Sequence, residues 1–215
     1  MPFPIVHNNN NSLLTRVISK QMILDNIDEY REAISFYRAY PDMLIDMYIK
    51  AMGDECTFKL YPFQRIFLRA MARYKDVFLT FSRGTSKSFN DDLWNIIECI
   101  LYPNTKLAIV ASTKGQSAGI LESKVSEILT LLPILRFEIR KTEKVKDQYT
   151  VYFKNGSSMC NLAAKSSSRG LRFTGITLEE IIEADPDMIQ EVILPTLAIQ
   201  RRAANGEYNK NETIT

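Results

Sequence analysis

A polar loop between an apolar run and a helix constrains the fold of this chain more than any other feature of its sequence. Residues 76–81 read Asp-Val-Phe-Leu-Thr-Phe and predict a short buried strand, and residues 82–88 read Ser-Arg-Gly-Thr-Ser-Lys-Ser. Helical periodicity begins at the end of this loop and continues to about Leu101. Backbone N–H groups at a helix start attract phosphate, and a lysine there adds charge. The pattern therefore predicts a phosphate-binding loop, although a solvated lysine at a helix cap is the plainer alternative.

The sequence after this helix predicts an α/β domain. A turn at Pro103 and Asn104 leads into an apolar strand over 106–111, so the order is strand, loop, helix, strand. That order is a βαβ unit, which requires a parallel sheet with a right-handed crossover. Farther along, the sequence predicts a helix over 114–132, strands over 136–140, 148–153 and 158–163 with a hairpin turn at 154–156, a strand over 173–178, and a helix over 186–204.

Two acids follow the strand at residues 175–178. Glu179 and Glu180 would lie at its carboxyl end, where ligands bind in open α/β sheets. On a parallel strand neighbouring the one before the phosphate loop, the first acid could hold a hydrated Mg²⁺ and the second could polarise water. An acidic helix N-terminus is the alternative reading of the same two residues.

The chain divides into an N-terminal extension and one larger domain. We expect residues 1–57 to form a flexible leader, rich in asparagine, followed by a helical extension or lid, and residues 58–215 to form the α/β domain. With 215 residues and 46% hydrophobic residues, the chain is long enough to bury a substantial core.

Composition excludes several classes of function. The three cysteines are widely spaced and the only histidine is His7, so we expect neither a disulfide framework, nor a zinc site, nor a Ser-His-Asp triad. The formal charge of +2 neither requires nor excludes nucleic acid. No apolar run approaches the roughly 20 residues of a membrane span, and the N-terminus does not resemble a signal peptide. We therefore expect a cytoplasmic protein without a membrane partner.

Four segments in order resemble the ATPase domain of phage terminase large subunits, the DNA-packaging motors. The resemblance covers about residues 58–197. Its segments are Tyr61-Pro-Phe-Gln64, like the adenine-recognising motif; residues 82–88, like a deviant Walker A; Ala108 to Gln116; and Arg169-Gly-Leu-Arg172 with the strand ending in Glu179-Glu180, like Walker B. The implied fold is a P-loop NTPase of the ASCE or RecA-like type, three αβα layers around a mainly parallel sheet, with an N-terminal helical extension.

The resemblance also implies roles for particular residues. Lys87 would bind the β- and γ-phosphates, Ser88 and Glu179 would hold Mg²⁺, and Glu180 would orient or deprotonate water. Arg169 would act as an arginine finger on a neighbouring subunit's ATP, although it reads equally well as a surface arginine. Gln64 would read the adenine edge with Tyr61 or Phe63 near the ring. The implied nucleotide-binding set is Tyr61, Gln64, Ser82, Arg83, Gly84, Thr85, Ser86, Lys87 and Ser88.

The activity implied is Mg²⁺-dependent ATP hydrolysis that drives double-stranded viral DNA into a procapsid in the host cytoplasm. The implied partners are a homo-oligomeric ring on a portal and a small terminase subunit. We expect no nuclease activity, because the sequence stops before the acidic nuclease domain of that family. Residues 211–215 predict a further strand.

Other readings stay open. A helicase-like translocase uses the same elements, and a strand-displacement assay would separate it from a duplex pump. Ser86 in place of a glycine, and Glu179 in place of an aspartate, favour a degenerate nucleotide-binding scaffold; a plain structural module is the third reading. The basic residues Arg136, Arg140, Lys141, Lys144 and Lys146 could neutralise DNA phosphates or form an ordinary solvated surface.

Overall fold

The computed structural model describes residues 25–82, 84–111, 114–163, 168, 170–179, 185–198, 201–202, 208–209 and 212–214. The chain forms two compact units, Met1–Phe36 and Tyr37–Thr215. Helix α2 (Ile27–Ala39) begins in the first unit and has no buried residue. The second unit includes α3 (Pro41–Met52) and everything after it. The domain boundary that the sequence predicts after residue 57 stays a prediction.

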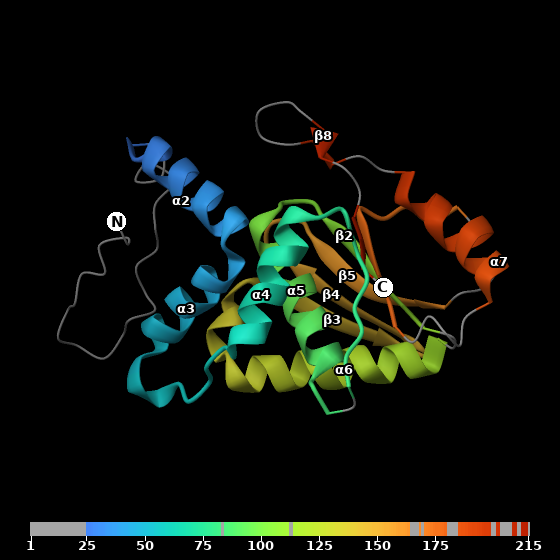
Figure 1. The fold of residues 1–215 in the computed structure, drawn as a ribbon, viewed down its shortest axis with the longest axis horizontal. Coiled ribbons are helices and arrows are strands. Elements are labelled where there is room, and N and C mark those ends of the chain that lie inside the picture. Colours follow the sequence, from blue (N-terminus) through green and yellow to red (C-terminus); the bar gives the residue numbers. More distant parts are fainter. Residues whose placement is uncertain are drawn as a thin grey trace. The chain divides into compact units, whose positions relative to one another are not determined.

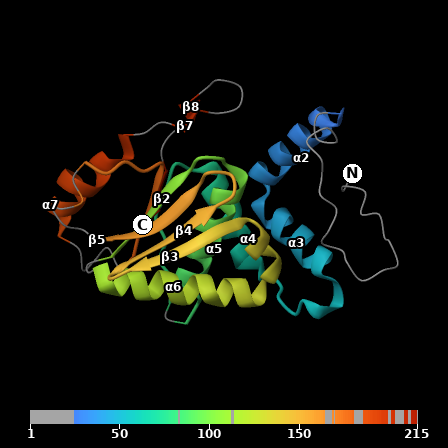
Figure 2. The same cartoon turned by 180° about the vertical axis from the view of Figure 1, so that it is seen from behind.

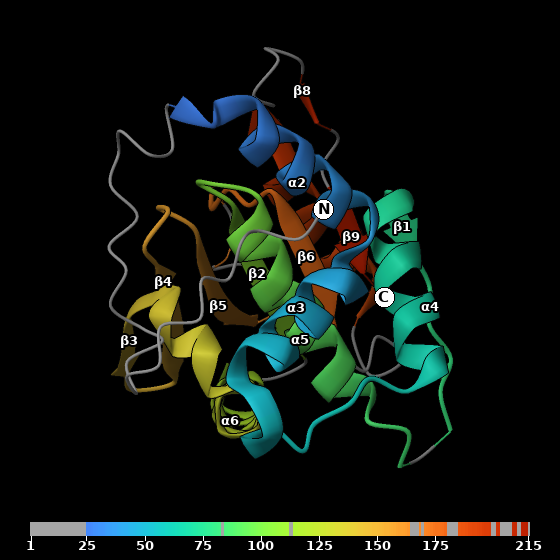
Figure 3. The same cartoon turned by 90° about the vertical axis from the view of Figure 1, so that its left-hand side faces the viewer.

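A seven-stranded sheet forms the centre of the second unit, in the order β1-β9-β6-β2-β5-β4-β3, and Figure 3 shows this order across the view. The pairs from β1 to β5 are parallel, whereas β4 and β3 add an antiparallel edge. The strands are β1 (Asp76–Val77), β2 (Lys106–Ala111), β3 (Ile139–Val145), β4 (Gln148–Phe153), β5 (Ser158–Ala163), β6 (Gly175–Leu178) and β9 (Glu212–Ile214). A separate short pair joins β7 (Arg201–Arg202) to β8 (Tyr208–Asn209).

Helices pack on both faces of this sheet. Leu107 and Ile109 of β2 belong to a core shared with α3, α4 (Pro62–Arg73), α5 (Lys87–Leu101) and α6 (Lys114–Leu131). Ala108 and Val110 point to the opposite face and belong to a second core with β6 and the helical segment after it. Successive residues of a strand face opposite sides, so these two cores define three layers. The front and back views show α6 running along the strands (Figures 1 and 2). Helix α7 (Pro186–Met188) lies on the other side of the sheet from α6. The predicted three-layer αβα fold with a mainly parallel sheet is confirmed.

Helix α5 is buried almost all round: twelve of its fifteen residues are buried. It contacts α4, α6 and the strands β2 and β5, so little of its surface remains for solvent. Several of its buried residues are polar, which an ordinary surface helix would turn toward water. These polar residues lie next to the candidate site.

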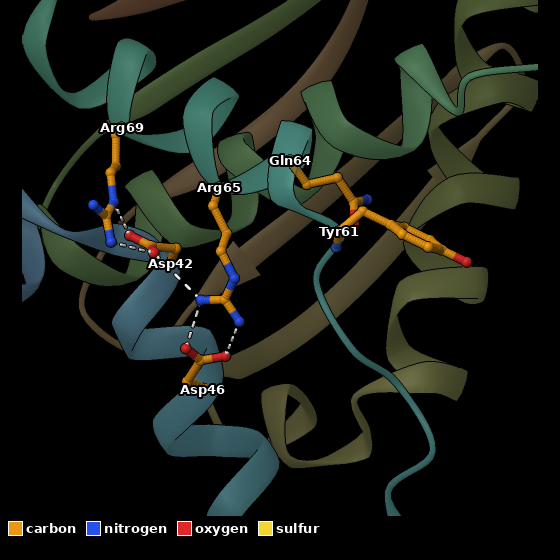
Figure 4. Close-up of polar contacts among 6 residues, drawn as sticks. All are labelled: Asp42, Asp46, Tyr61, Gln64, Arg65 and Arg69. Carbon is orange, nitrogen blue, oxygen red and sulfur yellow. Dashed lines mark hydrogen bonds and ion pairs between the residues drawn. The ribbon is translucent and has the colours of Figure 1, made fainter.

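An ion-pair cluster joins α3 to α4 (Figure 4). Arg69 donates to both oxygens of the fully buried Asp42, at 2.9 and 2.8 Å, and Arg65 makes the same two-pronged contact with Asp46 at 2.6 and 2.8 Å. Arg65 also lies 3.4 Å from Asp42. Burial alone would raise the pKa of Asp42, but the hydrogen bonds and charges of the two arginines hold that pKa below its usual value.

Most predicted elements agree with the structure. Strands β2, β4 and β5 have the predicted bounds, residues 154–156 form the turn between β4 and β5, and β9 falls within the strand predicted at 211–215. Helices α4, α5 and α6 also match the periodic segments. None of the helices in the described part of the chain is long and apolar enough to cross a membrane.

Three predicted elements were wrong in their extent. The strand predicted over 76–81 pairs only at Asp76 and Val77 in the described structure, with Thr213 and Ile214 of β9. The strand predicted over 136–140 is a 3₁₀ turn, η2 (Pro133–Phe137), followed by β3, since Pro133 starts the turn with a fixed φ. The last helix is divided into α7 (Pro186–Met188), a π-helical segment η5 (Ile189–Ile193) and a 3₁₀ segment η6 (Leu194–Ala198). Leu197 leaves helical geometry within η6 (φ −77°, ψ 27°), and residues 201–202, predicted as helix, form the strand β7.

Candidate functional site

The start of α5 is a helix N-terminus without a side-chain cap. Ser86 precedes the helix in a left-handed conformation (φ 57°, ψ 37°), and Lys87 and Ser88 are the first two helical residues. N–H groups of a first helical turn have no acceptor within the helix, and the helix dipole makes this end positive. The local geometry can therefore receive an anion such as a phosphate.

The loop ahead of the helix folds back on itself. Thr85 donates its N–H and its hydroxyl to the carbonyl oxygen of Ser82, at 3.4 and 2.6 Å. Gly84 has a φ of 84°, which a residue with a side chain adopts only with strain. This turn carries the chain from β1 to the helix start. Arg83, predicted for the same loop, lies outside the described residues.

Glu179 lies at the end of β6, facing the start of α5. Its N–H donates to the carbonyl of Val110 at 2.8 Å, which extends the β6–β2 pairing past the strand. Its buried carboxylate accepts a hydrogen bond from the hydroxyl of Ser88, 3.2 Å from Oε2, and the same oxygen lies 3.7 Å from Nζ of Lys87. The structure thus brings Lys87, Ser88 and Glu179 together.

These residues do not come from neighbouring strands. The sequence predicted that the acid-bearing strand would adjoin the strand before the phosphate loop, and this was wrong: β9 pairs with β6 on one side and β1 on the other. The convergence comes instead from α5, whose first turn carries Lys87 and Ser88 to the end of β6. The intervening strand comes from residues 212–214, far along the chain.

Two acids on α5 that the sequence analysis did not single out are buried close to Glu179. Burial and the nearby charge of Glu179 raise the pKa of Asp91 to about 8, with Lys87 opposing the shift. Burial and Glu179 also raise the pKa of Asp92 well above its usual value, against the opposing hydrogen bond from Asn95. Asp91 Oδ1, Asp92 Oδ2 and Glu179 Oε1 are buried without a hydrogen-bond partner in the described structure. Strongly shifted carboxyls of this kind mark candidate functional sites.

The sequence signal for these acids was weak. Asn90, Asp91 and Asp92 lie in the first turns of the predicted helix, and no motif in the sequence singles them out. One feature of the sequence could have indicated them: the next basic residue after Lys87 is Lys106, so no later residue of this helix can form an ion pair with its acids. A helix with apolar residues on every side and buried acids is a better candidate for a site than for a surface.

Gln64 and Tyr61 lie at the start of α4, ahead of the loop (Figure 4). Gln64 is buried; its Oε1 accepts from the N–H of Tyr61 at 2.9 Å, and its Nε2 donates to Oδ1 of Asn90 at 2.6 Å. Both ends of its amide therefore bond within the protein, which caps α4 and connects it to α5. The ring of Tyr61 is 66% exposed and stacks on Phe63 with centroids 5.9 Å apart.

Arg169 and Glu180 lie outside the described residues, and their expected roles stay predictions. In the described part of the chain, no three His, Cys, Asp or Glu side chains lie close enough to form a metal site by themselves. The Ser88 hydroxyl and the Glu179 carboxylate nevertheless fit Mg²⁺, which takes few protein oxygens and completes its shell with phosphates and water. The unsatisfied, buried Oε1 of Glu179 supports this fit.

The class of protein follows from the fold and the site geometry: the second unit has the P-loop NTPase fold. Among solved structures, the chain resembles the large terminase ATPase domain of Thermus phage P74-26, at 18% identity and a TM-score of 0.50, over 68% of this chain and 64% of that one. It also resembles the large terminase of bacteriophage HK97, at 17% identity and a TM-score of 0.55, over 73% of this chain and 32% of that one. A third match is the large terminase of a thermophilic bacteriophage, at 9% identity and a TM-score of 0.54, over 66% of this chain and 37% of that one.

These similarities establish a shared fold, and they confirm the fold that the terminase resemblance implied. The chain spans less than two thirds of the P74-26 ATPase domain and about a third of the other two proteins. No family model matches the chain. No curated protein matches it in sequence.

Proposed function

We propose that this chain is a terminase-type ATPase motor domain that hydrolyses ATP with Mg²⁺. The observation that carries the proposal is the meeting of Lys87 and Ser88, at an uncapped helix start, with the buried carboxylate of Glu179. A positive helix end, a lysine, a hydroxyl and a carboxylate are the groups that phosphoryl transfer requires in this fold. The fold shared with large terminase ATPase domains supports the same conclusion.

The roles of these residues follow from their chemistry. The N–H groups of the first turn of α5 and the loop at residues 82–86 would bind the phosphates. Lys87 would leave its contact with Glu179 and bind the outer phosphate oxygens instead. Ser88 and Glu179 would hold Mg²⁺, which neutralises charge on the transferred phosphoryl group. Glu180 would orient or deprotonate the attacking water, and Arg169 of a neighbouring subunit would stabilise the charge that develops.

The adenine base has a better-supported partner in Tyr61 than in Gln64. The exposed ring of Tyr61 can stack on a base, together with Phe63. Gln64 would reach the adenine edge only by giving up one of its two internal hydrogen bonds. In the assembled motor, hydrolysis would drive double-stranded DNA through a homo-oligomeric ring on a portal, with a small terminase subunit as partner.

The test of this proposal is ATP turnover and nucleotide binding by Lys87→Ala. Removing a positioned cation from a phosphoryl-transfer site should lower turnover by about 100-fold or more. Lys59→Ala, which removes an exposed lysine ahead of α4, should leave turnover unchanged. Equal turnover in both variants and the parent would contradict the proposal.

A nucleotide-binding scaffold without turnover is the second candidate, and the left-handed Ser86 favours it. A side chain at this position places a Cβ in a loop that must approach phosphates closely. Binding of ATP that depends on Lys87, without measurable hydrolysis by any form of the chain, would select the scaffold over the motor.

A further inference from the structure

A second contact joins α5 to β6 behind the one between Ser88 and Glu179. The hydroxyl of Thr177 donates to Oδ1 of Asn95 at 3.0 Å, and both side chains are buried. The amide of Asn95 also donates, from Nδ2, to Oδ1 of Asp92 at 3.3 Å. Both ends of this amide are therefore satisfied inside the protein, one by the strand and the other by its own helix.

The spacing places both contacts on the same faces. Ser88 and Asn95 are seven residues apart, which is nearly two turns, so both project from one side of α5. Thr177 and Glu179 are two residues apart and face the same side of the sheet. The Asn95–Thr177 and Ser88–Glu179 hydrogen bonds thus pair one helix face with one strand face at two points.

We propose that Asn95 and Thr177 are positioning residues that hold the helix bearing Lys87 and Ser88 in register with the strand that ends at Glu179. This inference rests on the proposed function. The Asn95–Thr177 contact adds a directional restraint on the rotation and sliding of α5 over β6 to the restraint from the packing around the helix. Under the proposed function, Ser88 of α5 and Glu179 at the end of β6 would together hold Mg²⁺, so its binding would depend on this register. Phosphates held by the loop and helix start alone depend on it much less.

A buried hydrogen bond of this kind is costly to break on one side. Removing the Thr177 hydroxyl leaves the Asn95 carbonyl buried without its strand partner, and the side chain or helix must move to find another. Such a shift moves the first turn of α5 relative to Glu179. The expected signature is a selective loss of the Mg²⁺-dependent part of nucleotide binding.

Thr177→Val tests the inference in the 215-residue chain, with a non-hydrolysable ATP analogue as the probe. Its dissociation constant is measured with excess Mg²⁺ and with EDTA. The benefit of Mg²⁺ is the dissociation constant in EDTA divided by the dissociation constant in Mg²⁺. This ratio should fall about fivefold or more in Thr177→Val, while the dissociation constant in EDTA changes about twofold at most. Thr177→Ser keeps the hydroxyl and should restore the parent ratio.

The matched control is Thr174→Val. Thr174 is also buried and lies three residues earlier, but its hydroxyl bonds to the backbone of Lys106 on β2 and not to α5. This variant should keep the parent ratio even if it is less stable. Urea unfolding of each variant establishes that it is folded, and Asn95→Leu removes the same bond from the helix side if Thr177→Val does not fold.

The outcomes separate this inference from the proposed function. A chain that binds the analogue through Lys87 with a clear Mg²⁺ effect, yet gives equal ratios for Thr177→Val and Thr174→Val, overturns the positioning role alone. A chain whose binding is indifferent to Lys87, or that does not bind the analogue, overturns the proposed function and this inference with it.

Discussion

Two helices of the second unit begin in opposite ways. Helix α4 starts at Pro62 after Tyr61, whose N–H is capped by Gln64, and the arginines of α4 hold the two aspartates of α3. Helix α5 starts after a left-handed Ser86 without a side-chain cap, and within the described ranges Oδ1 of its buried Asp91 accepts no hydrogen bond. The first region satisfies its carboxylates with arginines, whereas the second has an uncapped helix start and buried carboxylate oxygens without a hydrogen-bond partner among the described residues.

This difference in how buried polar groups are satisfied distinguishes the α3–α4 region, a structural scaffold, from the start of α5, a candidate site. The buried carboxylate of Asp42 has a pKa lowered by its two arginine partners, and these ion pairs fix the geometry of α3 on α4. Buried carboxyls without such partners, beside an uncapped helix end, cost stability until a ligand or a proton compensates them. The comparison therefore predicts that mutations in the two regions change stability in opposite directions.

The largest effect is expected from Asp42→Ala, which leaves Arg69 without its partner and Arg65 with Asp46 alone. Asp42 is fully buried, and removing its carboxylate should lower the free energy of unfolding by roughly 2–3 kcal/mol, the low end for a buried pair because the arginines left behind are partly exposed. Urea unfolding at pH 7 measures this. Asp28→Ala removes an exposed pair with Arg31 and should cause no measurable change. An equally small effect at Asp42 would contradict the assignment of this region as scaffold.

Asp91→Asn should act in the opposite direction and stabilise the fold relative to the parent at pH 8. The pKa of Asp91 is raised from 3.8 to about 8, so between these values the folded chain binds a proton that the unfolded chain has released. The stability of the parent therefore falls as pH rises through this window, by at most about 1.4 kcal/mol per unit from this residue. Asparagine removes that dependence, so the variant should gain on the parent between pH 5 and pH 8 in urea unfolding.

Asp42→Asn is the natural control for this experiment, because the pKa of Asp42 is lowered from 3.8. Its carboxylate stabilises the fold above that value, and the contribution is lost as pH falls through the lowered pKa of the folded state. The gap between parent and Asp42→Asn should therefore close in acid, whereas the gap for Asp91→Asn opens toward alkaline pH. The same pH trend in both variants would show that the two buried aspartates do not differ.

The elements most faithfully predicted from sequence are those that depend on local pattern. Strands β2, β4 and β5 are continuous or alternating apolar runs closed by clear turns, and their bounds agree with the structure. Strand β1 could not be bounded in the same way, since it pairs with β9, which lies about 135 residues later in the chain. The position of β9 between β1 and β6 also explains why the acid-bearing strand is not adjacent to β1.

The candidate site could be predicted in part for the same reason. Lys87, Ser88 and Glu179 lie at an element start and an element end, where sequence patterns are informative, and the structure brings them together. Asp91 and Asp92 were missed because their burial depends on the layers that cover α5, which no local pattern contains. The expected role of Gln64 at the adenine edge stays a prediction. A glutamine three residues into a helix can also act as a cap, and Gln64 accepts the N–H of Tyr61 in this way.

The smallest effect is expected from Ser86→Gly, at the start of α5 itself. A residue with a Cβ in the left-handed region costs about 1–2 kcal/mol, and glycine loses part of this gain through its freer unfolded chain, so the net stabilisation should be roughly 0.5–1 kcal/mol. Lys146→Gly is the matched control, because Lys146 has a φ of 53° in the turn between β3 and β4. Both variants should raise the midpoint of urea unfolding, but only Ser86→Gly should change the affinity for ATP, since only its Cβ lies in the loop proposed to hold phosphates. If Ser86→Gly gains stability without any change in ATP affinity, the strain is an ordinary property of a turn, and the contrast between the two helix starts no longer identifies a site.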